Sequence, residues 1–248
     1  MIRKLASDYS RHVALVTGGA SFLGRAISLK LAREGFDLAL HYQSSANRTK
    51  KFAEEVKGFG AKVLVLKTDL RQVQQVSSLT QTVFKKFKRL DLLVNNASLF
   101  YPTPLSKTVP SQWMELFNVN LFAPYFLSRA ASPLLKKTHG CIINITDIYG
   151  ENPILKDYSA YCVSKAGLIT TTKILAKELG PLVRVNAVSP GAIIIPRTYS
   201  RKQRKELINR SALKRQGTPE EIAEAVYFLS THRFITGQVL KVDGGRFF

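Results

Sequence analysis

The chain has 248 residues, 45 % of them hydrophobic, and its 37 Lys and Arg residues against 17 Asp and Glu residues give a formal net charge of +20. This length favours a single large domain spanning residues 1–248, and no apolar run approaches the roughly 20 residues that a membrane span requires. Residues 1–11 contain no apolar segment typical of a secretory signal, so we expect a cytoplasmic protein without a membrane partner.

Apolar runs of strand length alternate along the chain with longer amphipathic stretches. Strands are expected at residues 12–17, 36–42, 62–67, 91–95, 141–145, 183–188 and 239–242. Helices are expected at residues 22–33, 73–87, 158–179 and 220–229. Two more are expected between the second strand and Phe59 and after Pro110, and Thr218 is the expected N-cap of the last helix. This alternation predicts one α/β domain of the Rossmann type, with a doubly wound parallel sheet of about seven strands and helices on both faces.

The two cysteines, Cys141 and Cys162, fall on an expected strand and an expected helix. The sequence therefore predicts neither a disulfide nor a metal site. In a doubly wound sheet, ligands bind beyond the carboxyl ends of the strands. The residues that report on function are therefore expected in the loops that follow strands one, two, four, five and six.

The loop after the first strand is rich in glycine. Residues 17–24 read Thr-Gly-Gly-Ala-Ser-Phe-Leu-Gly, and the next helix begins inside this run. Glycines let the backbone turn tightly and approach a pyrophosphate, whose charge then faces the N-terminus of a helix. An ordinary strand–helix turn has the same composition, so this loop indicates a dinucleotide only together with further motifs.

Three further motifs follow later strands. Residues 95–97 read Asn-Asn-Ala, Tyr161 and Lys165 open the helix after the fifth strand, and residues 190–191 read Pro-Gly. With the Thr-Gly turn, these motifs resemble the short-chain dehydrogenase/reductase family along nearly the whole chain. The resemblance implies cofactor-binding roles for Gly18, Leu23, Gly24, His41, Tyr42, Ser44, Ser45, Asp69, Leu70, Asn95, Ala97, Ser98, Tyr161, Lys165, Pro190 and Gly191.

Phe22 departs from the family's phosphate loop, which usually reads Thr-Gly-x-x-x-Gly-x-Gly and has glycine at this position. Pteridine reductases also lack this glycine, but they carry an arginine there. We therefore expect no phosphate-binding role for Phe22. The neighbouring Arg25 is a candidate to supply part of the missing positive charge.

Two segments resemble one branch of the family, the pteridine reductases. Residues 95–105 read Asn-Asn-Ala-Ser-Leu-Phe-Tyr-Pro-Thr-Pro-Leu, and residues 41–45 read His-Tyr-Gln-Ser-Ser. Asp147 follows the fifth strand where most of the family has its catalytic serine, and pteridine reductases and bacterial dihydromonapterin reductases carry aspartate there. Asp147 precedes Tyr161 by 14 positions, one more than the usual gap, so Thr146 is a rival for the serine-equivalent position.

Tyr161 and Lys165 are the expected catalytic pair. Four residues apart on one helix, they share a face, and a nearby ammonium is expected to lower the pKa of the phenol, which makes proton transfer practical near neutral pH. By resemblance, Lys165 also holds the nicotinamide ribose, Asp147 relays a proton and Asn120 anchors a water of the relay. The alternatives are a helix-capping carboxylate at Asp147 and a structural asparagine at position 120.

The resemblance also implies a substrate site formed by Ser98, Phe100, Asp147, Tyr158 and Tyr161. Phe100 matches the aromatic residue that covers the pterin, so that a flat heterocycle is held between phenyl and nicotinamide, with stacking on the order of 1 kcal/mol. The alternative is that the aromatic residues belong to the core and that Ser98 is an ordinary polar loop residue.

The end of the second strand favours NADPH over NADH. NAD-binding sites usually place Asp or Glu there to bind the ribose 2′-hydroxyl, whereas this chain has no carboxylate between His41 and Glu54. Ser44, Ser45 and Arg48 offer hydroxyl groups and a positive charge, which suit a 2′-phosphate.

Together these patterns predict an NADPH-dependent pteridine reductase that converts a dihydropterin of the dihydromonapterin, dihydrobiopterin or dihydrofolate class to its tetrahydro form. A 3-oxoacyl-carrier-protein reductase is the alternative within the family. A nucleotide-binding or nucleic-acid-binding module without catalysis is the alternative outside the enzymes. The family commonly forms tetramers, so the resemblance implies a homotetramer.

Much of the positive charge lies within residues 197–215, which overlap residues 192–211, the segment that the family closes over its substrate. Positive charge favours anionic partners, such as the tail of a folate or an acidic carrier protein. No RNA-binding signature accompanies it, and a basic solvated surface is the alternative. Nucleic acid is therefore not the expected partner.

Overall fold

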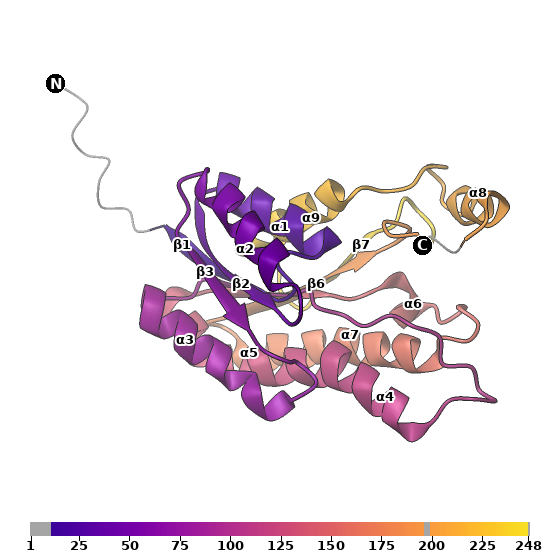
Figure 1. Cartoon of the computed structure of the whole chain (residues 1–248), viewed down its shortest axis with the longest axis horizontal. Helices are drawn as coiled ribbons and strands as arrows, with labels where there is room; N and C mark the ends of the chain where they lie inside the picture. The colour runs from indigo at the N-terminus through magenta and orange to yellow at the C-terminus, as the bar shows by residue number, and fades with distance from the viewer. Residues whose placement is uncertain (1–10, 196–198, 248) are drawn as a thin grey trace.

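The computed structural model describes residues 11–195 and 199–247, which form one α/β domain (Figure 1). The strands are β1 (His12–Val16), β2 (Phe36–Tyr42), β3 (Val63–Lys67), β4 (Leu92–Asn95), β5 (Cys141–Ile145), β6 (Arg184–Pro190) and β7 (Val239–Val242). The α-helices are α1 (Phe22–Arg33), α2 (Ala46–Lys57), α3 (Ser77–Phe87), α4 (Pro110–Phe117), α5 (Ala123–Thr138), α6 (Ile148–Glu151), α7 (Ser159–Leu179), α8 (Arg201–Asn209) and α9 (Pro219–Thr231).

Within the described residues the strands form one seven-stranded parallel sheet in the order β3-β2-β1-β4-β5-β6-β7. Val16 of β1 pairs with Leu40 of β2 on one side and with Val94 of β4 on the other. The chain therefore leaves β1 in opposite directions to build the two halves of the sheet, and the switch point lies between β1 and β4. Parallel sheets bind ligands at such a point, beyond the carboxyl ends of the strands. The predicted fold class is confirmed.

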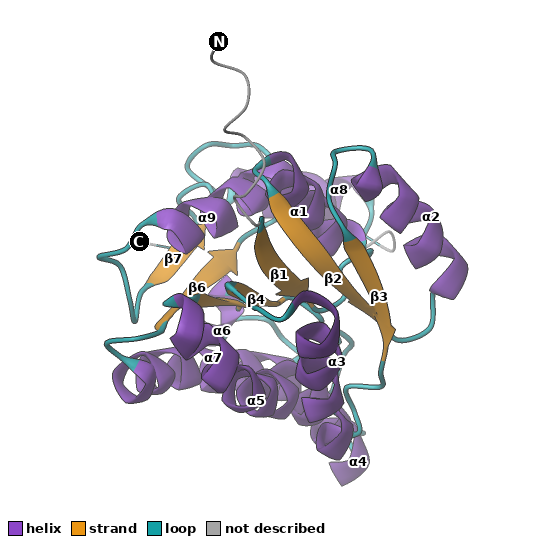
Figure 2. Ribbon diagram, turned by 90° about the vertical axis from the view of Figure 1, so that its left-hand side faces the viewer, coloured by secondary structure: helices purple, strands orange, loops and turns teal. Residues whose placement is uncertain are grey.

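Helices cover both faces of the sheet. Figures 1 and 2 show α1, α2 and α9 on one face and α3, α5 and α7 on the other. Successive side chains of a strand point to opposite faces. Val16 accordingly packs in an apolar cluster with Ile27 of α1 and Val226 of α9, whereas its neighbour Leu15 packs in the second cluster with Leu127 of α5. Burial on both faces explains why the strands read as continuous apolar runs.

Two predicted helices are interrupted. The helix expected at residues 73–87 is a 3-10 helix (Val73–Gln75) followed by α3. The long helix after Pro110 is α4, a π-helical turn (Asn118–Phe122) and α5. Pro124, at the start of α5, has no N–H to donate to the carbonyl four residues earlier, which gives a local reason for the irregular turn.

Two helices were not predicted. α6 has four residues, too few to show a periodic pattern. α8 buries none of its described residues, so its sequence needs no apolar stripe, which is the pattern that predicts a helix. α8 begins with a capping box in which Ser200 Oγ accepts from Gln203 N at 3.2 Å and the Gln203 side chain accepts from Ser200 N at 2.8 Å. The predicted start of α9 is confirmed, because Thr218 is its N-cap and Pro219 its first residue.

Both cysteines lie in the interior of the domain. Cys141 and Cys162 are buried and free.

None of the helices in the described ranges combines the length and the apolar character needed to cross a membrane. Arg197 of the expected basic segment and residues 1–10 lie outside the described residues.

Candidate active site

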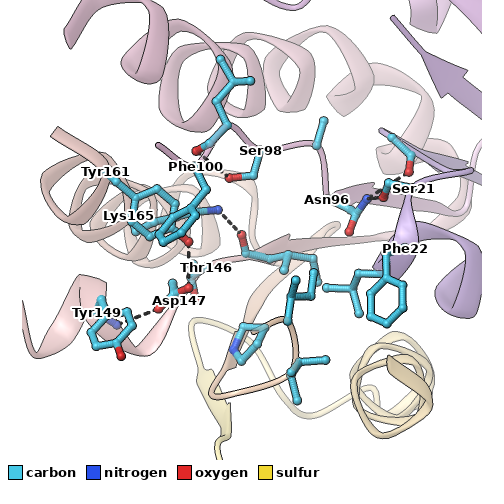
Figure 3. Close-up of a pocket in the computed structure, with 18 of the residues that line it drawn as sticks. Ser21, Phe22, Asn96, Ser98, Phe100, Thr146, Asp147, Tyr149, Tyr161 and Lys165 are labelled. Atoms are coloured by element: carbon cyan, nitrogen blue, oxygen red, sulfur yellow. Dashed lines mark hydrogen bonds between the residues drawn. The ribbon is translucent and has the colours of Figure 1, made fainter. Parts of the chain in front are cut away.

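A cavity of about 690 Å³ opens beyond the carboxyl ends of the strands, beside the switch point (Figure 3). Its wall comes from the loops after β1, β2, β3, β4, β5 and β6, from α8 and from the C-terminal segment. The predicted site residues that line it are Gly18, Leu23, His41, Leu70, Ala97, Ser98, Phe100, Asp147, Tyr161, Lys165, Pro190 and Gly191. Residues of the expected motifs, far apart in sequence, therefore meet at one site.

The other predicted site residues do not line the cavity: Gly24, Tyr42, Ser44, Ser45, Asp69, Asn95, Asn120 and Tyr158. Asn95 points into the sheet, where its Nδ2 donates to Asn144 Oδ1 at 2.8 Å. Asp69 forms an ion pair with Arg71 at 2.8 Å, which lowers the pKa of the Asp69 carboxyl. These residues lie behind or beside the cavity wall.

The glycines of the first loop are required by its shape. Gly18 has a φ of +60°, which favours glycine, and a Cβ on Gly24 would lie 2.1 Å from the Gly18 carbonyl oxygen. Ser21 caps α1 by accepting a hydrogen bond from Gly24 N at 3.2 Å. The amides of Phe22 and Leu23 begin α1 and have no partner within the helix, and both residues line the cavity. The loop is therefore built to receive an anionic group at a helix N-terminus.

Two residues connect this loop to the loop after β4. Asn96 Nδ2 donates to the Thr17 carbonyl at 2.8 Å, and Thr17 Oγ1 accepts from the amides of Asn96 at 2.9 Å and Ala97 at 3.0 Å. Figure 3 shows Asn96 beside Ser21 at this end of the cavity. The Thr-Gly and Asn-Asn-Ala motifs therefore support each other's backbone.

His41 has a role that its sequence position does not reveal. It is buried, its Nδ1 lies 3.2 Å from Gly18 N and its Nε2 lies 2.9 Å from the Thr68 carbonyl. Because an amide donates and a carbonyl accepts, the ring carries its proton on Nε2 and is neutral. Burial lowers the pKa of His41. The imidazole therefore orients the first glycine of the phosphate loop.

Arg48 and Gln43 line the cavity near the end of β2. Arg48 Nη2 donates to Ser45 Oγ at 2.9 Å, so the arginine and the predicted serine are in contact. Arg25 does not take the place of a phosphate-loop arginine, because it forms an ion pair with Glu55 and is not part of the cavity wall. Phe22 lines the cavity with 62 % of its surface exposed.

The proton-carrying groups meet at the carboxyl end of β5. The Tyr161 hydroxyl donates to Asp147 Oδ2 at 2.7 Å, and Lys165 Nζ donates to the Ile145 carbonyl at 2.9 Å (Figure 3). The Thr146 hydroxyl instead donates to the Val188 carbonyl at 3.0 Å. Of the two rivals for the serine-equivalent position, Asp147 is therefore the one that contacts Tyr161.

The prediction that Lys165 lowers the pKa of Tyr161 is wrong for this structure. Burial and the negative charge of Asp147 raise the pKa of Tyr161 well above its ordinary value. Lys165 Nζ lies 5.8 Å from the centre of the Tyr161 ring and donates elsewhere. Burial lowers the pKa of Lys165 to about 8 and raises the pKa of Asp147. The nearest charge to the phenol is thus a carboxylate, which the spacing of Tyr161 and Lys165 alone could not show.

These shifts predict a pH dependence. Lys165 is charged below about pH 8 and neutral above it, so kcat/KM is expected to fall above about pH 8 if the ammonium assists the proton transfer. The charge of Asp147 raises the pKa of Lys165, so Asp147→Asn should move this fall to lower pH. Rates measured across the range in a buffer of constant ionic strength test the sign. A fall that stays in place or moves to higher pH would contradict it.

Asn120 lies in the π-helical turn and is fully buried. Its Oδ1 accepts from Leu99 N at 2.8 Å and from Ser98 Oγ at 3.1 Å, and its Nδ2 donates to Leu99 O at 3.0 Å and to Ser164 Oγ at 3.1 Å. This arrangement matches the structural alternative considered for Asn120. It fixes the loop that carries Ser98 and Phe100 against α7.

Three aromatic side chains form one side of the site. Phe100 stacks on Tyr158 with ring centres 4.5 Å apart and an angle of 15° between the rings, and it meets Tyr161 edge-on at 4.7 Å and 82°. Phe100 lines the cavity and is 45 % exposed, so part of its surface is open to a ligand. Tyr158 thus supports Phe100 from behind and is not itself part of the wall.

Sequence reasoning missed several cavity residues. They include Tyr149, Leu155 and Arg246, whereas Tyr199 and Leu207, which also line the cavity, lie in the segment expected to close over the substrate. Among the described residues of the wall, Asp147 is the one acidic side chain, whereas Arg48, Lys165 and Arg246 are basic. The cavity therefore carries a net positive charge, which suits anionic ligands.

Comparisons with known proteins agree with this geometry. A family model described as enoyl-(acyl carrier protein) reductase matches residues 18–246. A short-chain dehydrogenase/reductase from Serratia marcescens, solved as a double mutant, superposes with a TM-score of 0.89 at 31 % identity, covering 95 % of this chain and 97 % of that one. This chain belongs to the short-chain dehydrogenase/reductase family. It is an NAD(P)H-dependent oxidoreductase.

Other relatives of this short-chain dehydrogenase/reductase are named for specific activities. The 3-oxoacyl-[acyl-carrier-protein] reductase of Synechocystis is 36 % identical over 240 residues, covering 94 % of this chain and 96 % of that protein. The reductase of the same name from Thermotoga maritima is 35 % identical over 241 residues, with the same coverage. A blue fluorescent protein from a metagenomic library, solved with NADPH, has a TM-score of 0.89 at 31 % identity and covers 95 % of this chain and 97 % of that one. These relatives support the family, but not the narrower resemblance to pteridine reductases.

Proposed function

We propose that the protein is an NADPH-dependent reductase that converts a dihydropterin to its tetrahydro form. The observation that carries this proposal is the contact of Tyr161 with Asp147 at 2.7 Å, in a position where most of the family has serine. An ionised carboxylate accepts hydrogen bonds but cannot donate one to a ketone oxygen, and its charge disfavours the oxyanion that forms when a ketone is reduced. The N–H and amino groups of a pterin ring are donors that a carboxylate can accept.

The aromatic side of the cavity supports the same substrate class. Phe100 is held in place by Tyr158 through a stacked contact at 4.5 Å, and it remains 45 % exposed. A flat heterocycle that lies on this ring gains burial and stacking of about 1 kcal/mol. A linear acyl chain gains burial there but no stacking.

The cavity residues fit NADPH. A Cβ on Gly24 would collide with the Gly18 carbonyl, so the loop that presents the N-terminus of α1 to a pyrophosphate keeps this shape only with glycine there. Arg48 lines the end where the adenosine ribose binds in this fold, and no acidic residue of the described wall lies at that end. A 2′-phosphate would meet a positive charge and no repulsion. The blue fluorescent protein bound to NADPH is similar along nearly the whole chain.

The catalytic residues have distinct tasks in this proposal. Bound NADPH supplies a hydride to the carbon of the dihydropterin C=N bond, and the adjacent nitrogen takes a proton. Tyr161 gives this proton, directly or through a water, and the phenolate takes a proton back from solvent by way of Asp147. The raised pKa of Asp147 makes its carboxylate a stronger base than that of an exposed aspartate, so it can take up this proton in transit. The Lys165 ammonium offsets negative charge as the proton leaves.

A second candidate is reduction of a 3-oxoacyl thioester. Relatives that are 33–36 % identical along almost the whole chain carry this name, and no pteridine reductase is among those described above. The formal charge of +20 also suits an acidic carrier protein. A thioester substrate would, however, leave the carboxylate of Asp147 facing the ketone oxygen.

Initial rates of NADPH oxidation with dihydromonapterin, dihydrobiopterin, dihydrofolate and an acetoacetyl thioester separate the two candidates. We expect kcat/KM for at least one dihydropterin to exceed that for the thioester by about 100-fold or more, because a buried polar group rejects a substrate that cannot pair with it. The opposite ratio would assign the protein to the second candidate. Folded, NADPH-binding protein that turns over none of them would exclude both, and tight RNA binding by it would support the non-catalytic alternative.

The homotetramer implied by the family resemblance stays a prediction. Sedimentation of the purified protein measures it directly.

A further inference from the structure

The C-terminal segment after β7 turns back sharply toward the cavity. The Asp243 carboxylate accepts hydrogen bonds from Gly245 N at 2.9 Å and from Phe247 N at 3.0 Å. Gly244 and Gly245 have φ values of +67° and +71°, which favour glycine. This turn is packed against the loop after β6, because a Cβ on Gly191 would lie 2.5 Å from Asp243 Cα. The position of the next side chain, Arg246, is therefore set by a rigid turn.

Arg246 reaches the cavity wall and is held there by two hydrogen bonds. Its Nη2 donates to the Tyr149 hydroxyl at 2.9 Å, and its Nη1 donates to the Leu207 carbonyl at 3.3 Å. Its Nε is buried without a hydrogen-bond partner in the part of the chain that the structure describes. A guanidinium has five N–H donors. The contacts with Tyr149 and Leu207 use two of them.

Arg246 is connected to the catalytic carboxyl through a single residue. Tyr149 N donates to Asp147 Oδ1 at 2.9 Å, while the hydroxyl of the same tyrosine accepts from Arg246. The charge of Arg246 acts on Asp147, whose pKa it helps to lower against the larger effect of burial. Figure 3 shows Tyr149 beside Asp147, at the end of the cavity opposite Phe22. Arg246 thus belongs to the substrate end of the cavity and not to the phosphate end.

The charges at this end are unbalanced. Lys165 and Arg246 are cations, and Asp147 is the one carboxylate of the described wall. A neutral substrate that displaces water from this end would leave the excess positive charge without an anion, which is unfavourable. A carboxylate on the substrate would balance it, and the planar fork of an arginine pairs with carboxylates in two parallel hydrogen bonds.

We propose that Arg246, supported by Tyr149, is a substrate-binding residue that selects pterins whose substituent carries a carboxylate. This proposal rests on the proposed function, since the ring would be a pterin held on Phe100. Because Arg246 Nε is buried, the carboxylate accepts hydrogen bonds from the N–H groups of Nη1 and Nη2 that Leu207 and Tyr149 leave free.

The test uses pterin-6-carboxylate and 6-hydroxymethylpterin, two oxidised ligands that share one ring and differ in charge. Their dissociation constants from the complex of the full chain with NADP⁺ are measured by the quenching of pterin fluorescence, so the readout does not depend on turnover. We expect the native protein to bind the carboxylate about 10- to 100-fold more tightly than the alcohol. Arg246→Met should remove this ratio, and Arg246→Lys should retain part of it.

Arg233→Met is the matched control. Arg233 is exposed and is not part of the cavity wall, so its removal lowers the net charge by the same amount without changing the site. The melting temperature and the NADPH affinity of each variant show whether the C-terminal turn is intact. The ratio should persist in the control.

Two results would overturn the proposal, and they have different meanings. If the native protein binds both pterins equally, or if Arg246→Met weakens both by the same factor, Arg246 is not a carboxylate-binding residue although the pterin site stands. If neither pterin binds to NADP⁺-loaded protein, the proposed function fails and the selectivity for carboxylates fails with it.

Discussion

Tyr161→Phe is expected to lower kcat for dihydropterin reduction by about 100- to 10,000-fold, the contribution of a positioned proton donor. The phenol is buried and its hydroxyl bonds only to Asp147 among the described residues, so the substitution removes the donor and keeps the ring that Phe100 contacts edge-on. Affinity for NADPH should change little, because Lys165 and the phosphate loop are untouched. Stopped-flow rates with saturating NADPH measure the effect on the chemical step.

Tyr161→Phe is also expected to lower the stability of the protein, and this loss must be measured separately from the loss of activity. Loss of the hydroxyl leaves Asp147 Oδ2 without its donor, which costs about 1–3 kcal/mol when the acceptor is buried. The same hydrogen bond lowers the pKa of Asp147, so that pKa should rise further in the variant. Thermal unfolding separates this loss from the kinetic one. If kcat stays within about tenfold of the native value while the protein is folded, Tyr161 is not the proton donor.

Asp147→Ser is expected to reverse the substrate preference. Turnover of the dihydropterin should fall by about 100-fold or more as the proton-exchanging carboxyl is lost, whereas turnover of the acetoacetyl thioester should be maintained or rise, because a hydroxyl can donate to a ketone oxygen. Serine also suits the second task of this residue. Asp147 is the N-cap of α6 and accepts from Tyr149 N at 2.9 Å, and serine is an equally good capping residue.

Asp147→Asn is the companion variant, because it keeps the shape and the capping oxygen, removes the acidity and the negative charge, and places an amide N–H donor where Oδ2 stood. It should lose dihydropterin turnover to a similar extent as serine, and its amide, like the serine hydroxyl, can donate to the ketone oxygen of the thioester. Equal losses with both substrates in both variants would show that Asp147 supports the structure of α6 and does not select the substrate.

Strands buried on both faces were the most predictable part of the fold. β2 and β5 begin and end where the sequence predicts them, since every residue of such a strand must be apolar or paired. α8 was missed because it packs no buried side chain, and its one local signal is the capping box at Ser200. The break between α4 and α5 depends on Pro124, whose effect on the preceding turn is visible only when the register of the helix is known.

The site was predictable where residues lie in recognisable motifs, as with Tyr161 and Lys165. The sign of the pKa shift of Tyr161 was not, because the closer charge belongs to Asp147, on another element. Arg246 lies 97 residues from Tyr149 in sequence, and only the folded sheet brings the C-terminal turn beside α6. Side-chain partners from distant elements decide both the electrostatics and the shape of the substrate end of the cavity.

The most direct measurement is a crystal structure of the complex with NADP⁺ and a dihydropterin. We predict a pterin ring lying on Phe100, with the nitrogen next to the reacting carbon within about 3 Å of the Tyr161 hydroxyl or the Asp147 carboxyl. A pterin bound elsewhere, or a phenol turned away from the ring, would contradict the proposed chemistry.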